Sequence, residues 1–459
     1  MEYVLKGNKI IFLILICCLV FLVGTLFCLE IESLDKIILP FLISLLIGTV
    51  IFAILNILCR DKFCSKIYLI SVLLHFIFIL FWQIFKYHIL NYHNPTPNIF
   101  MPFTVDNDGV LYHSIGVYIA KNFTLSTFQE HLTGGLFPKI IGILYYYFGI
   151  NPFLPCLLNC LISGFTAIFI YLIGKNTLEN KQIAKIYSIS SILTFSHIIN
   201  TSVLMRDGYI TIFMYSSLYL SYLFDKNKNI LYLFLTLFSL YLLYSFRPYA
   251  AIIILLAIIA TFIFINLNMK MKNNKIKANK LSFLLILFSP IIIAAFIFIL
   301  IKSSALFKVI SIDDLINIRE ASYQFGAAEV AIDFGALYSK FFLLPFIVGY
   351  IYLFFAPFPW EWIYPRRMIY VPDMLILYCF LPSFFKNIKK VLLERNYLLV
   401  VSLFSIIFMF SIYCITLGNT GAIHRLRGPF IPLIYLIAFY RPNQFLSKII
   451  RQILNWRIL

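Results

Sequence analysis

Charged residues are scarce in this sequence. Only 12% of the 459 residues are Asp, Glu, Lys or Arg, which is about half the share found in a typical soluble domain. Apolar residues make up 62% of the chain and the mean hydropathy is +0.94, carried by long runs of Ile, Leu and Phe. Because a membrane-spanning helix needs about 20 such residues, the composition excludes a soluble enzyme and predicts a polytopic membrane protein.

Acidic residues are scarcer than basic ones. The chain has 19 Asp and Glu against 37 Lys and Arg, a formal net charge of +18. In a soluble protein this excess would indicate nucleic acid, but here the basic residues lie in short loops between apolar runs. Such loops set the topology of a membrane protein and lie beside anionic lipid headgroups. We therefore expect membrane lipids, and no nucleic acid, as partners of these charges.

Paired cysteines are also missing. Eight of the nine cysteines lie in or at the ends of apolar runs, and only Cys64 lies in a polar loop. No spacing matches a zinc site or a disulfide framework, so we interpret the cysteines as small apolar residues. The first apolar run, Ile10–Leu29, is not followed by an Ala-x-Ala cleavage pattern, which favours an uncleaved first span over a signal peptide.

The apolar runs predict one all-α membrane domain over residues 1–459, a helical bundle with about 12–14 spans. Two longer polar stretches, 86–136 and 302–339, are too short to bury a core of their own, and we expect both on the external side. The counts of Lys and Arg place the N-terminus on the cytoplasmic side, although the two counts disagree by one crossing between residues 302 and 385. An apolar segment, Phe137–Phe148, is predicted to lie in the outer interface. The expected spans are Ile10–Leu29, Ile37–Cys59, Ile67–Phe85, Phe153–Gly174, Ile186–Leu204, Tyr209–Phe224, Ile230–Phe246, Ala250–Ile265, Leu281–Ile301, Phe341–Phe355, Met374–Phe385, Leu398–Leu417 and Phe430–Tyr440.

Two carboxylates stand two residues apart in the first polar stretch, at Asp106 and Asp108. Beside a membrane surface, such a pair can act as a general base or hold a divalent metal. The same Asp-Asn-Asp-Gly sequence is also typical of turns and helix caps, so the residues alone leave both interpretations open. Tyr112 and His113 follow closely and are candidates for the wall of a substrate site.

The order of motifs around these carboxylates adds a second argument. Asp108 is followed by Tyr112 and then by the aromatic segment Gly135–Pro152, which precedes a long span. This order resembles the polytopic GT-C glycosyltransferases, including the protein O-mannosyltransferase and lipid A aminoarabinose transferase types. Over residues 106–174 the resemblance implies that Asp108 is the catalytic acidic residue, with Asp106 as its substitute or metal partner. Gly109 stands where many members carry a second acidic residue, and two additional spans precede the loop.

Cationic residues at the predicted outer ends of spans form another group of candidates, because charges at the edge of apolar segments are costly. Arg206, next to Asp207, either makes an intramembrane ion pair that fixes helix packing or has a functional role. Arg247 lies at a tight turn between two apolar runs. It is either an anchor in the headgroup layer or a ligand for a lipid phosphate.

Three residues that can carry positive charge, His424, Arg425 and Arg427, lie in a segment predicted to be external, where basic residues are disfavoured. A lipid phosphate or pyrophosphate would account for them, since Arg binds phosphate oxygens through two N–H groups. A simple headgroup contact is the alternative.

Trp360 and Glu361 belong to a Pro-rich aromatic segment, which is either an interfacial belt or a wall for a sugar or prenyl chain.

These features predict an envelope glycosyltransferase of the inner (cytoplasmic) membrane. It would transfer a sugar from a polyprenyl-phosphate-linked donor to a glycan, lipid or protein acceptor at the outer face, since no nucleotide-binding domain is evident. An O-antigen or capsule repeat-unit polymerase is the alternative enzyme, and a lipid-linked oligosaccharide flippase or transporter is the alternative of another class. A transporter should show internal repeats and polar residues at mid-membrane depth. A divalent metal is the cofactor that the carboxylate pair suggests, and the residues leave open whether one is bound.

Overall fold

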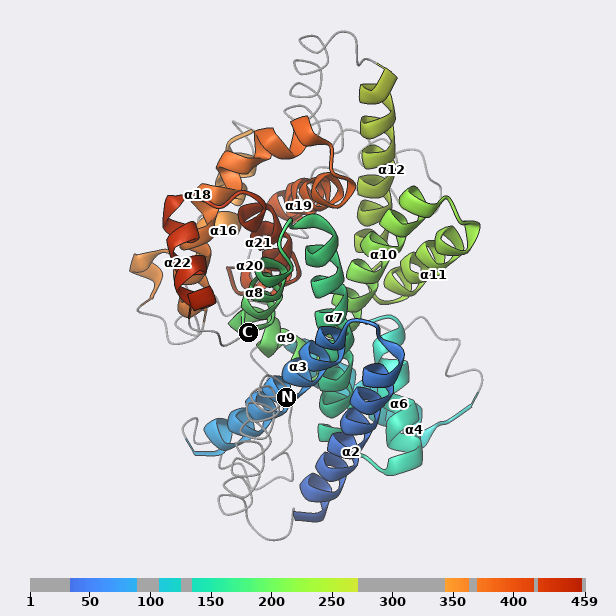
Figure 1. Ribbon diagram of the computed structural model, residues 1–459. Coiled ribbons are helices and arrows are strands. Elements are labelled where there is room, and N and C mark those ends of the chain that lie inside the picture. The colour runs from blue at the N-terminus through green and yellow to red at the C-terminus, as the bar shows by residue number, and fades with distance from the viewer. Residues whose placement is uncertain are drawn as a thin grey trace, which may run out of the picture.

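A computed structural model describes residues 34–88, 107–124, 134–270, 343–362, 370–416 and 420–455. Every regular element in these ranges is a helix and none is a strand, which confirms the all-α class for this part of the chain (Figure 1). The helices are α2 (Leu34–Leu58), α3 (Lys62–His88), α4 (Asn107–Lys121), α6 (Leu136–Phe148), α7 (Phe153–Thr177), α8 (Lys181–Ile192), α9 (Phe195–Ser202), α10 (Asp207–Asn227), α11 (Ile230–Phe246), α12 (Pro248–Lys270), α16 (Leu343–Phe355), η3 (Pro359–Glu361), α18 (Val371–Glu394), α19 (Tyr397–Thr416), α20 (Thr420–Arg427), η4 (Gly428–Phe430), α21 (Ile431–Tyr440) and α22 (Gln444–Asn455).

Five of the described helices are long and apolar enough to cross a membrane. They are Ile38–Leu58, Lys62–Phe81, Phe153–Thr177, Pro248–Asn266 and Tyr397–Cys414. Other expected spans form helices that are shorter, such as α11, or more polar, such as α10. Two further expected spans, Ile10–Leu29 and Leu281–Ile301, lie outside the described residues, as does the stretch 302–339, so the number of spans stays a prediction.

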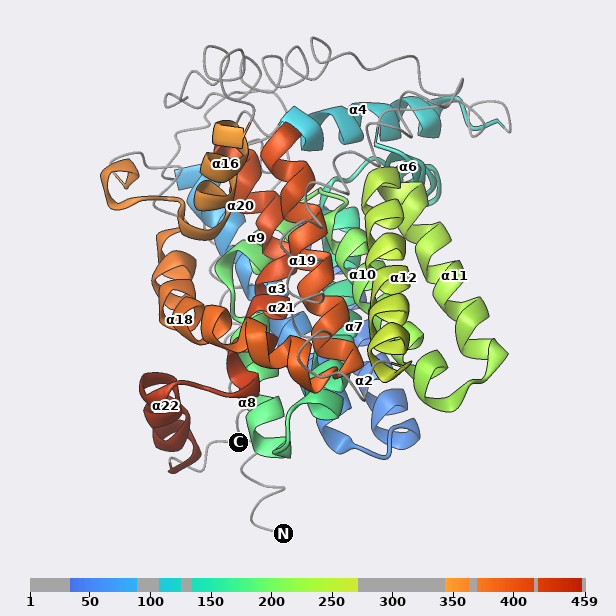
Figure 2. The same cartoon turned by 90° about the horizontal axis from the view of Figure 1, so that it is seen from above.

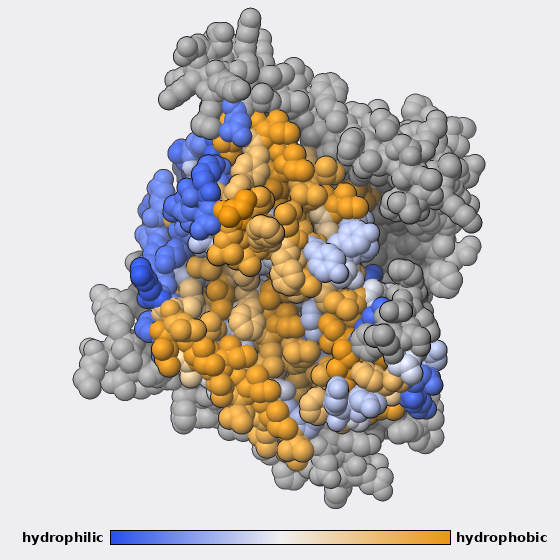
Figure 3. All heavy atoms as spheres, turned by 90° about the vertical axis from the view of Figure 1, so that its right-hand side faces the viewer, coloured by the Kyte–Doolittle hydropathy of each residue, from blue (hydrophilic) through white to orange (hydrophobic). Residues whose placement is uncertain are grey.

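The spanning helices differ in how much protein surrounds them. In the window Tyr397–Cys414 of α19, 89% of the residues are buried inside the molecule, against 17% for α2. Large apolar side chains are exposed on the outer helices, for example Ile57 of α2 at 80% and Phe234 of α11 at 68%. Figure 3 shows a broad hydrophobic surface bounded along one edge by hydrophilic residues. This surface is suited to contact with lipid chains.

One expected span, Ile186–Leu204, is not a single helix. The chain leaves helical structure at Leu193 and Thr194, between α8 and α9. The carboxylate of Asp373 on α18 accepts hydrogen bonds from the backbone N–H groups of Phe195 and Ser196. These bonds satisfy donors that the first turn of a helix leaves unpaired, so a side chain distant in sequence stabilises the break.

The helix expected to lie in the interface, Phe137–Phe148, is found as α6 and packs beneath α4. The two helices approach closely at Gly116 and Gly142, where an added Cβ atom would lie 2.4 Å from Ile141 and 2.5 Å from Ile119, respectively. Figure 2 shows α4 lying across one end of the bundle, with α8 and α22 at the opposite end. We name these the Asp108 end and the Asp61 end.

At the Asp61 end, one carboxylate ties the α2–α3 turn to α7 and α8. Asp61 Oδ2 lies 2.7 Å from Lys175 Nζ and 3.1 Å from Lys181 Nζ, and it accepts a hydrogen bond of 2.9 Å from the Tyr171 hydroxyl. Partial burial raises the pKa of Asp61, but hydrogen bonds from Lys175, Tyr171 and Lys181 outweigh it and hold this pKa well below its usual range.

Candidate functional site

A chain of charge-assisted hydrogen bonds connects four helices at the Asp108 end. The guanidinium of Arg425 on α20 donates through Nη1 to Asp108 Oδ2 at 2.7 Å and through Nε to Asp207 Oδ2 at 2.8 Å. Arg247, between α11 and α12, donates through Nη2 to Asp207 Oδ1 at 3.2 Å. Asp108 and Asp207 both lie in the first turn of their helices, where the helix dipole favours negative charge. With Arg206, these residues form what we call the arginine–aspartate cluster.

The side chains of the cluster differ in how far they are exposed. The side chains of Asp207, Arg247 and Arg425 are only 1%, 4% and 9% exposed, whereas that of Asp108 is 42% exposed. Buried charges are tolerated only when they are paired and hydrogen-bonded, and Asp207 meets this condition with an arginine on each oxygen. Asp108 is therefore the acidic group of the cluster that a reactant from outside can reach.

Among the described residues of the cluster, positive charge exceeds negative charge. Arg206 donates from Nη1 to the carbonyl oxygen of Phe246 at 2.9 Å, and its guanidinium lies 5.9 Å from the ring centroid of Tyr112. Three described guanidinium groups thus face two described carboxylates. The buried Nε atoms of Arg206 and Arg247 lack a hydrogen-bond partner among the described residues. An anionic group with several acceptor oxygens, such as a phosphate, matches this excess of charge and of donors.

The turn that carries Arg247 is held in place by α6. Gly135 precedes α6 at φ +68°, and an added Cβ atom there would lie 2.3 Å from the carbonyl oxygen of Ser245. At Gly134, with φ +98°, a Cβ would lie 2.4 Å from the ring of Tyr112. Only glycine combines positive φ with such close approach. The Gly-Gly pair lets the α11–α12 turn and α4 meet beside the cluster.

A buried asparagine supports the segment that leads into Asp207. Residues Val203 to Arg206 link α9 to α10 without regular helix, and Nδ2 of Asn159 on α7 donates to the carbonyl oxygens of Val203 at 2.6 Å and Met205 at 2.9 Å. Buried backbone without regular helix needs such partners because it does not reach water. Asn159 therefore fixes the position from which Asp207 faces the two arginines.

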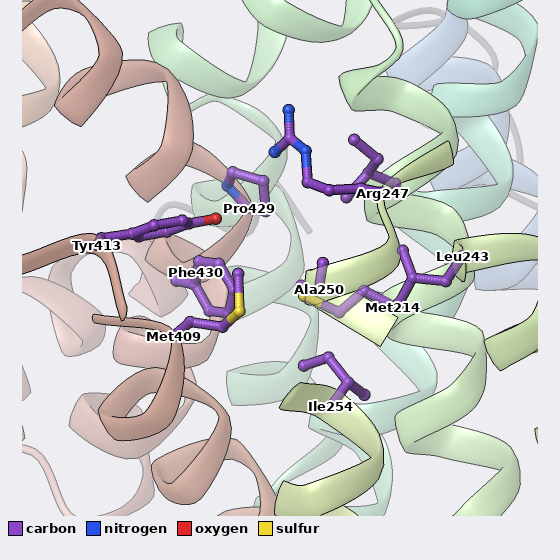
Figure 4. A pocket seen from close by; sticks show the side chains of 10 residues that line it. Met214, Leu243, Arg247, Ala250, Ile254, Met409, Tyr413, Pro429 and Phe430 are labelled. Atoms are coloured by element: carbon purple, nitrogen blue, oxygen red, sulfur yellow. The ribbon is translucent and has the colours of Figure 1, made fainter. Parts of the chain in front are cut away.

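A narrow apolar pocket starts at Arg247 (Figure 4). Of the described residues in its wall, only Arg247 is charged, and Figure 4 shows the guanidinium of Arg247 directed away from the apolar side chains. The pocket lies between α10, α11, α12, α19 and η4. Its lining residues are Ile210, Met214, Leu243, Arg247, Ala250, Ile254, Met409, Tyr413, Pro429 and Phe430.

The structure separates the three basic residues of the 424–427 segment. Arg427 is fully buried and donates to the carbonyl oxygens of Leu353 at 3.1 Å and Ala356 at 2.8 Å, at the end of α16. Its Nη2 lies 3.2 Å from His424 Nδ1, and the His424 ring stacks on Tyr370 with centroids 4.8 Å apart. Arg425 alone reaches the arginine–aspartate cluster. Arg427 fastens α20 to α16.

The expected wall residues do not gather around the cluster as a group. Tyr112 is buried against Phe137 and under Arg206. His113 hydrogen-bonds through Nδ1 to the hydroxyl of Tyr145 on α6 at 2.8 Å, and burial lowers the pKa of this imidazole. His113 therefore serves the α4–α6 contact.

Trp360 and Glu361 lie in η3. Trp360 is 66% exposed and stacks on Phe358 with ring centroids 4.7 Å apart. Glu361 is buried and accepts a hydrogen bond of 2.9 Å from the backbone N–H of Phe358. Glu361 thus stabilises its own turn, while Trp360 presents an aromatic face on the surface of the molecule.

The described residues do not fit a divalent metal site at the cluster. Both oxygens of Asp207 accept from arginines, Asp108 Oδ2 accepts from Arg425, and the described ranges contain no group of three or more His, Cys, Asp or Glu that could hold a metal. Asp106 lies outside the described residues, so a metal held with its help stays a prediction.

One residue of the cluster was not assigned its role from the sequence. The Arg206-Asp207 dipeptide was expected either to make an intramembrane ion pair that fixes helix packing or to have a function, with no partner assigned to Asp207. The structure gives the partners of its carboxylate as Arg247 and Arg425. Adjacent residues at a helix start point in different directions, and an acid at the edge of an apolar run was the available signal.

No protein-family model matches this chain, and neither a curated protein nor a solved structure is significantly similar to it.

Proposed function

We propose that this protein is a membrane glycosyltransferase that uses a polyprenyl-phosphate-linked sugar as donor. The observation that supports it is the arginine–aspartate cluster: three arginines and a buried carboxylate beside one exposed carboxylate, Asp108. A lipid-linked donor requires cationic groups for its phosphate, and an acceptor hydroxyl requires a base. The resemblance to GT-C enzymes around Asp108 points to the same pair of tasks.

The proposed topology puts the Asp108 end outside and the Asp61 end in the cytoplasm. Lysines gather at the Asp61 end, as the positive-inside rule requires, with Lys175 and Lys181 on α7 and α8 and Lys226 and Lys228 at the α10–α11 turn. The N-terminus is then cytoplasmic, the protein has about 12–14 spans, and it resides in the inner membrane of a bacterial-type envelope.

The proposed reaction is a single displacement at the anomeric carbon. Asp108 takes the proton of the acceptor hydroxyl, the acceptor oxygen forms the new glycosidic bond, and the bond between the anomeric carbon and the phosphate oxygen breaks. The leaving lipid phosphate gains negative charge, which Arg425, Arg247 and Arg206 stabilise where it develops. A single displacement inverts the configuration at that carbon.

The donor site has a cationic head and an apolar continuation. Arg247 contributes to the cluster and also forms the polar wall of the apolar pocket beside α10 and α12. A phosphate held by Arg247 would therefore lie next to apolar side chains, and because the pocket is narrow these side chains would move apart to admit the first carbons of a prenyl chain. The acceptor would approach from the exposed side of Asp108 and could be a glycan, a lipid or a protein.

The substitution Asp108→Asn tests the proposal. Asparagine preserves the shape and the exposed position, so the protein should accumulate normally, while loss of the base should lower transfer by about 10²–10⁴-fold. The readout is the surface glycan of intact cells, together with binding of polyprenyl monophosphate to the purified protein, which Asp108→Asn should retain and Arg425→Gln should weaken. An unchanged glycan in the Asp108→Asn strain contradicts the catalytic assignment.

Topology is tested by labelling a cysteine at an exposed position close to the site. Asn122→Cys lies just after α4 and Lys181→Cys at the start of α8, and both positions are exposed. A membrane-impermeant maleimide should label the first and not the second in intact cells, with the parent protein as control because half-buried Cys59 and Cys379 set the background. The reverse pattern would invert the proposed topology.

A pair of buried histidines favours a transporter as the second candidate function. His75 of α3 and His197 of α9 are 0% and 2% exposed, their rings lie 5.8 Å apart, and both nitrogens of His197 lack a hydrogen-bond partner among the described residues. Ionisable groups inside a bundle mark transport paths in many membrane proteins. If lipid-linked oligosaccharide export stops in a His197→Phe strain while Asp108→Asn leaves the glycan intact, the transporter is correct and the transferase is not.

A further inference from the structure

The helix α22 at the Asp61 end has two kinds of exposed side chain. Leu446 and Ile450 are 1% and 4% exposed and pack on the bundle, while Phe445 is 56% exposed. Lys448 and Arg451 are exposed on another side of the helix. At 100° per residue, the apolar residues occupy a half-circle of which the bundle covers only the part at Leu446 and Ile450. The edge at Phe445 stays uncovered in the described structure.

The neighbouring helix α18 repeats this combination along one stripe. Phe385 and Leu393 are 45% and 44% exposed, and Lys389 lies between them at the same helical phase, with Lys386 beside it. Spacings of four residues place Phe385, Lys389 and Leu393 above one another on one face. Lysines among exposed apolar side chains are typical of the level at which lipid chains meet headgroups.

The α18 and α22 helices are held together by a polar connection. The backbone N–H of Asn443 donates to Ser383 Oγ at 3.0 Å, and Asn387 Nδ2 donates to the carbonyl oxygen of Arg441 at 3.0 Å. Arg441 also lies 2.7 Å from Glu394, so the one acidic residue at this end of α18 is neutralised. The exposed charges left on this surface are Lys386, Lys389, Lys448 and Arg451.

We infer that this surface is a binding site for anionic phospholipid at the membrane surface of the Asp61 end. The exposed residues of α18 and α22 named above form what we call the basic platform. In it, lysine and arginine side chains contact phosphate headgroups, while Phe445, Phe385 and Leu393 contact the acyl chains beneath them. Charge complementarity selects an anionic lipid over a zwitterionic one. The inference does not depend on the proposed transfer reaction.

Native mass spectrometry of the full chain tests lipid selectivity. The protein is reconstituted in nanodiscs of phosphatidylcholine with phosphatidylglycerol, and the retained lipids are compared for Lys448→Gln/Arg451→Gln and for the control Lys226→Gln/Lys228→Gln. The control removes two cations at the same end, from the turn between α10 and α11, which Figure 2 shows on the far side from α22. The platform variant should lose phosphatidylglycerol selectivity by up to about 25-fold, at about fivefold per cation, and the control should change little. Equal loss in both variants overturns the site.

Two further measurements separate lipid binding from misfolding and from protein contacts. The charge-conserving variant Lys448→Arg/Arg451→Lys should keep the selectivity of the parent. Phe445→Trp should gain fluorescence that is quenched by lipids with brominated chains, whereas the control Gln444→Trp, exposed on the side of α22 that carries Arg451, should not. Absence of quenching at position 445 would mean that water or another protein covers this edge, and the inference would be wrong.

Discussion

The two ends of the bundle use charge in opposite ways. At the Asp61 end the lysines paired with Asp61 are 38% and 56% exposed, so water solvates their charges and the ion pairs fasten turns together. At the Asp108 end the arginines paired with Asp207 are 4% and 9% exposed. Desolvated charges are costly unless every one has a partner, so the buried cluster is maintained at a cost in stability. Charge pairs therefore fasten solvated turns at the Asp61 end, whereas at the Asp108 end they hold charge that is removed from water.

The largest expected loss of stability follows from removing the carboxylate of Asp207 at the Asp108 end. Asp207→Asn removes the carboxylate that pairs with both buried arginines, so that Arg247 loses its described ion pair and Arg425 keeps only the one with Asp108. Breaking such a buried pair costs about 3–5 kcal/mol of unfolding free energy. The thermal unfolding midpoint of the purified protein measures this. Asp225→Asn, which removes an exposed ion pair with Lys228, is the control and should cost no more than about 1 kcal/mol. Equal effects of the two substitutions would show that the cluster is not buried in the membrane-embedded protein.

A smaller loss of stability is expected at Gly135, where a substitution tests the packing of α6 behind the cluster. Gly135→Ala adds a methyl group 2.3 Å from the carbonyl oxygen of Ser245 at φ +68°, and overpacking of this kind costs about 1–3 kcal/mol. Gly149→Ala is the matched control, because Gly149 has φ +81° but no atom within 4 Å of an added Cβ. The excess destabilisation of Gly135→Ala over Gly149→Ala isolates the contact between α6 and the Arg247 turn. No excess would mean that this turn can move away freely.

The smallest expected effect is the pH dependence of the Asp61 end. Because the pKa of Asp61 is lowered in the folded protein, its ion pairs stabilise fully above the unfolded pKa of about 4 and this contribution fades as the pH falls below it. Since the lysines are partly exposed, we expect about 1 kcal/mol or less. The unfolding midpoint of the parent should exceed that of Asp61→Asn at pH 7, and the difference should shrink below about pH 4. A difference that stays constant down to acidic pH would assign the stabilisation to packing.

Much of the fold followed from hydropathy, because a lipid environment demands long apolar helices. The ranges expected for α2, α3, α7, α11, α12 and α19 agree with the structure to within a few residues at most of their ends. The break between α8 and α9 was missed, since it depends on Asp373, about 180 residues away in sequence. Nothing in the local sequence Ile186–Leu204 signals a carboxylate supplied by another helix.

The candidate site was predicted in part. Arg206 and Arg247 were singled out by their charge beside apolar runs, and Arg425 by its place in a basic segment predicted to be external. Asp108 was singled out by its pairing with Asp106 and by the resemblance of its surroundings to GT-C enzymes. The structure brings these four residues together around Asp207. Arg427 was grouped with Arg425, although residues two apart on a helix point to nearly opposite sides. His424, Trp360 and Glu361 likewise have their described partners elsewhere.

The sequence by itself determined the environment of this protein and which residues are costly within it. Apolar composition predicts long membrane-spanning helices, because backbone hydrogen bonds must be satisfied within each segment, and every regular element among the described residues is a helix. A carboxylate at residue 108 and arginines at residues 247 and 425 are conspicuous in such a chain. Only the tertiary structure decided that Asp207 joins the two arginines, because the pairing spans up to 218 residues and depends on four helix starts and turns meeting at one end.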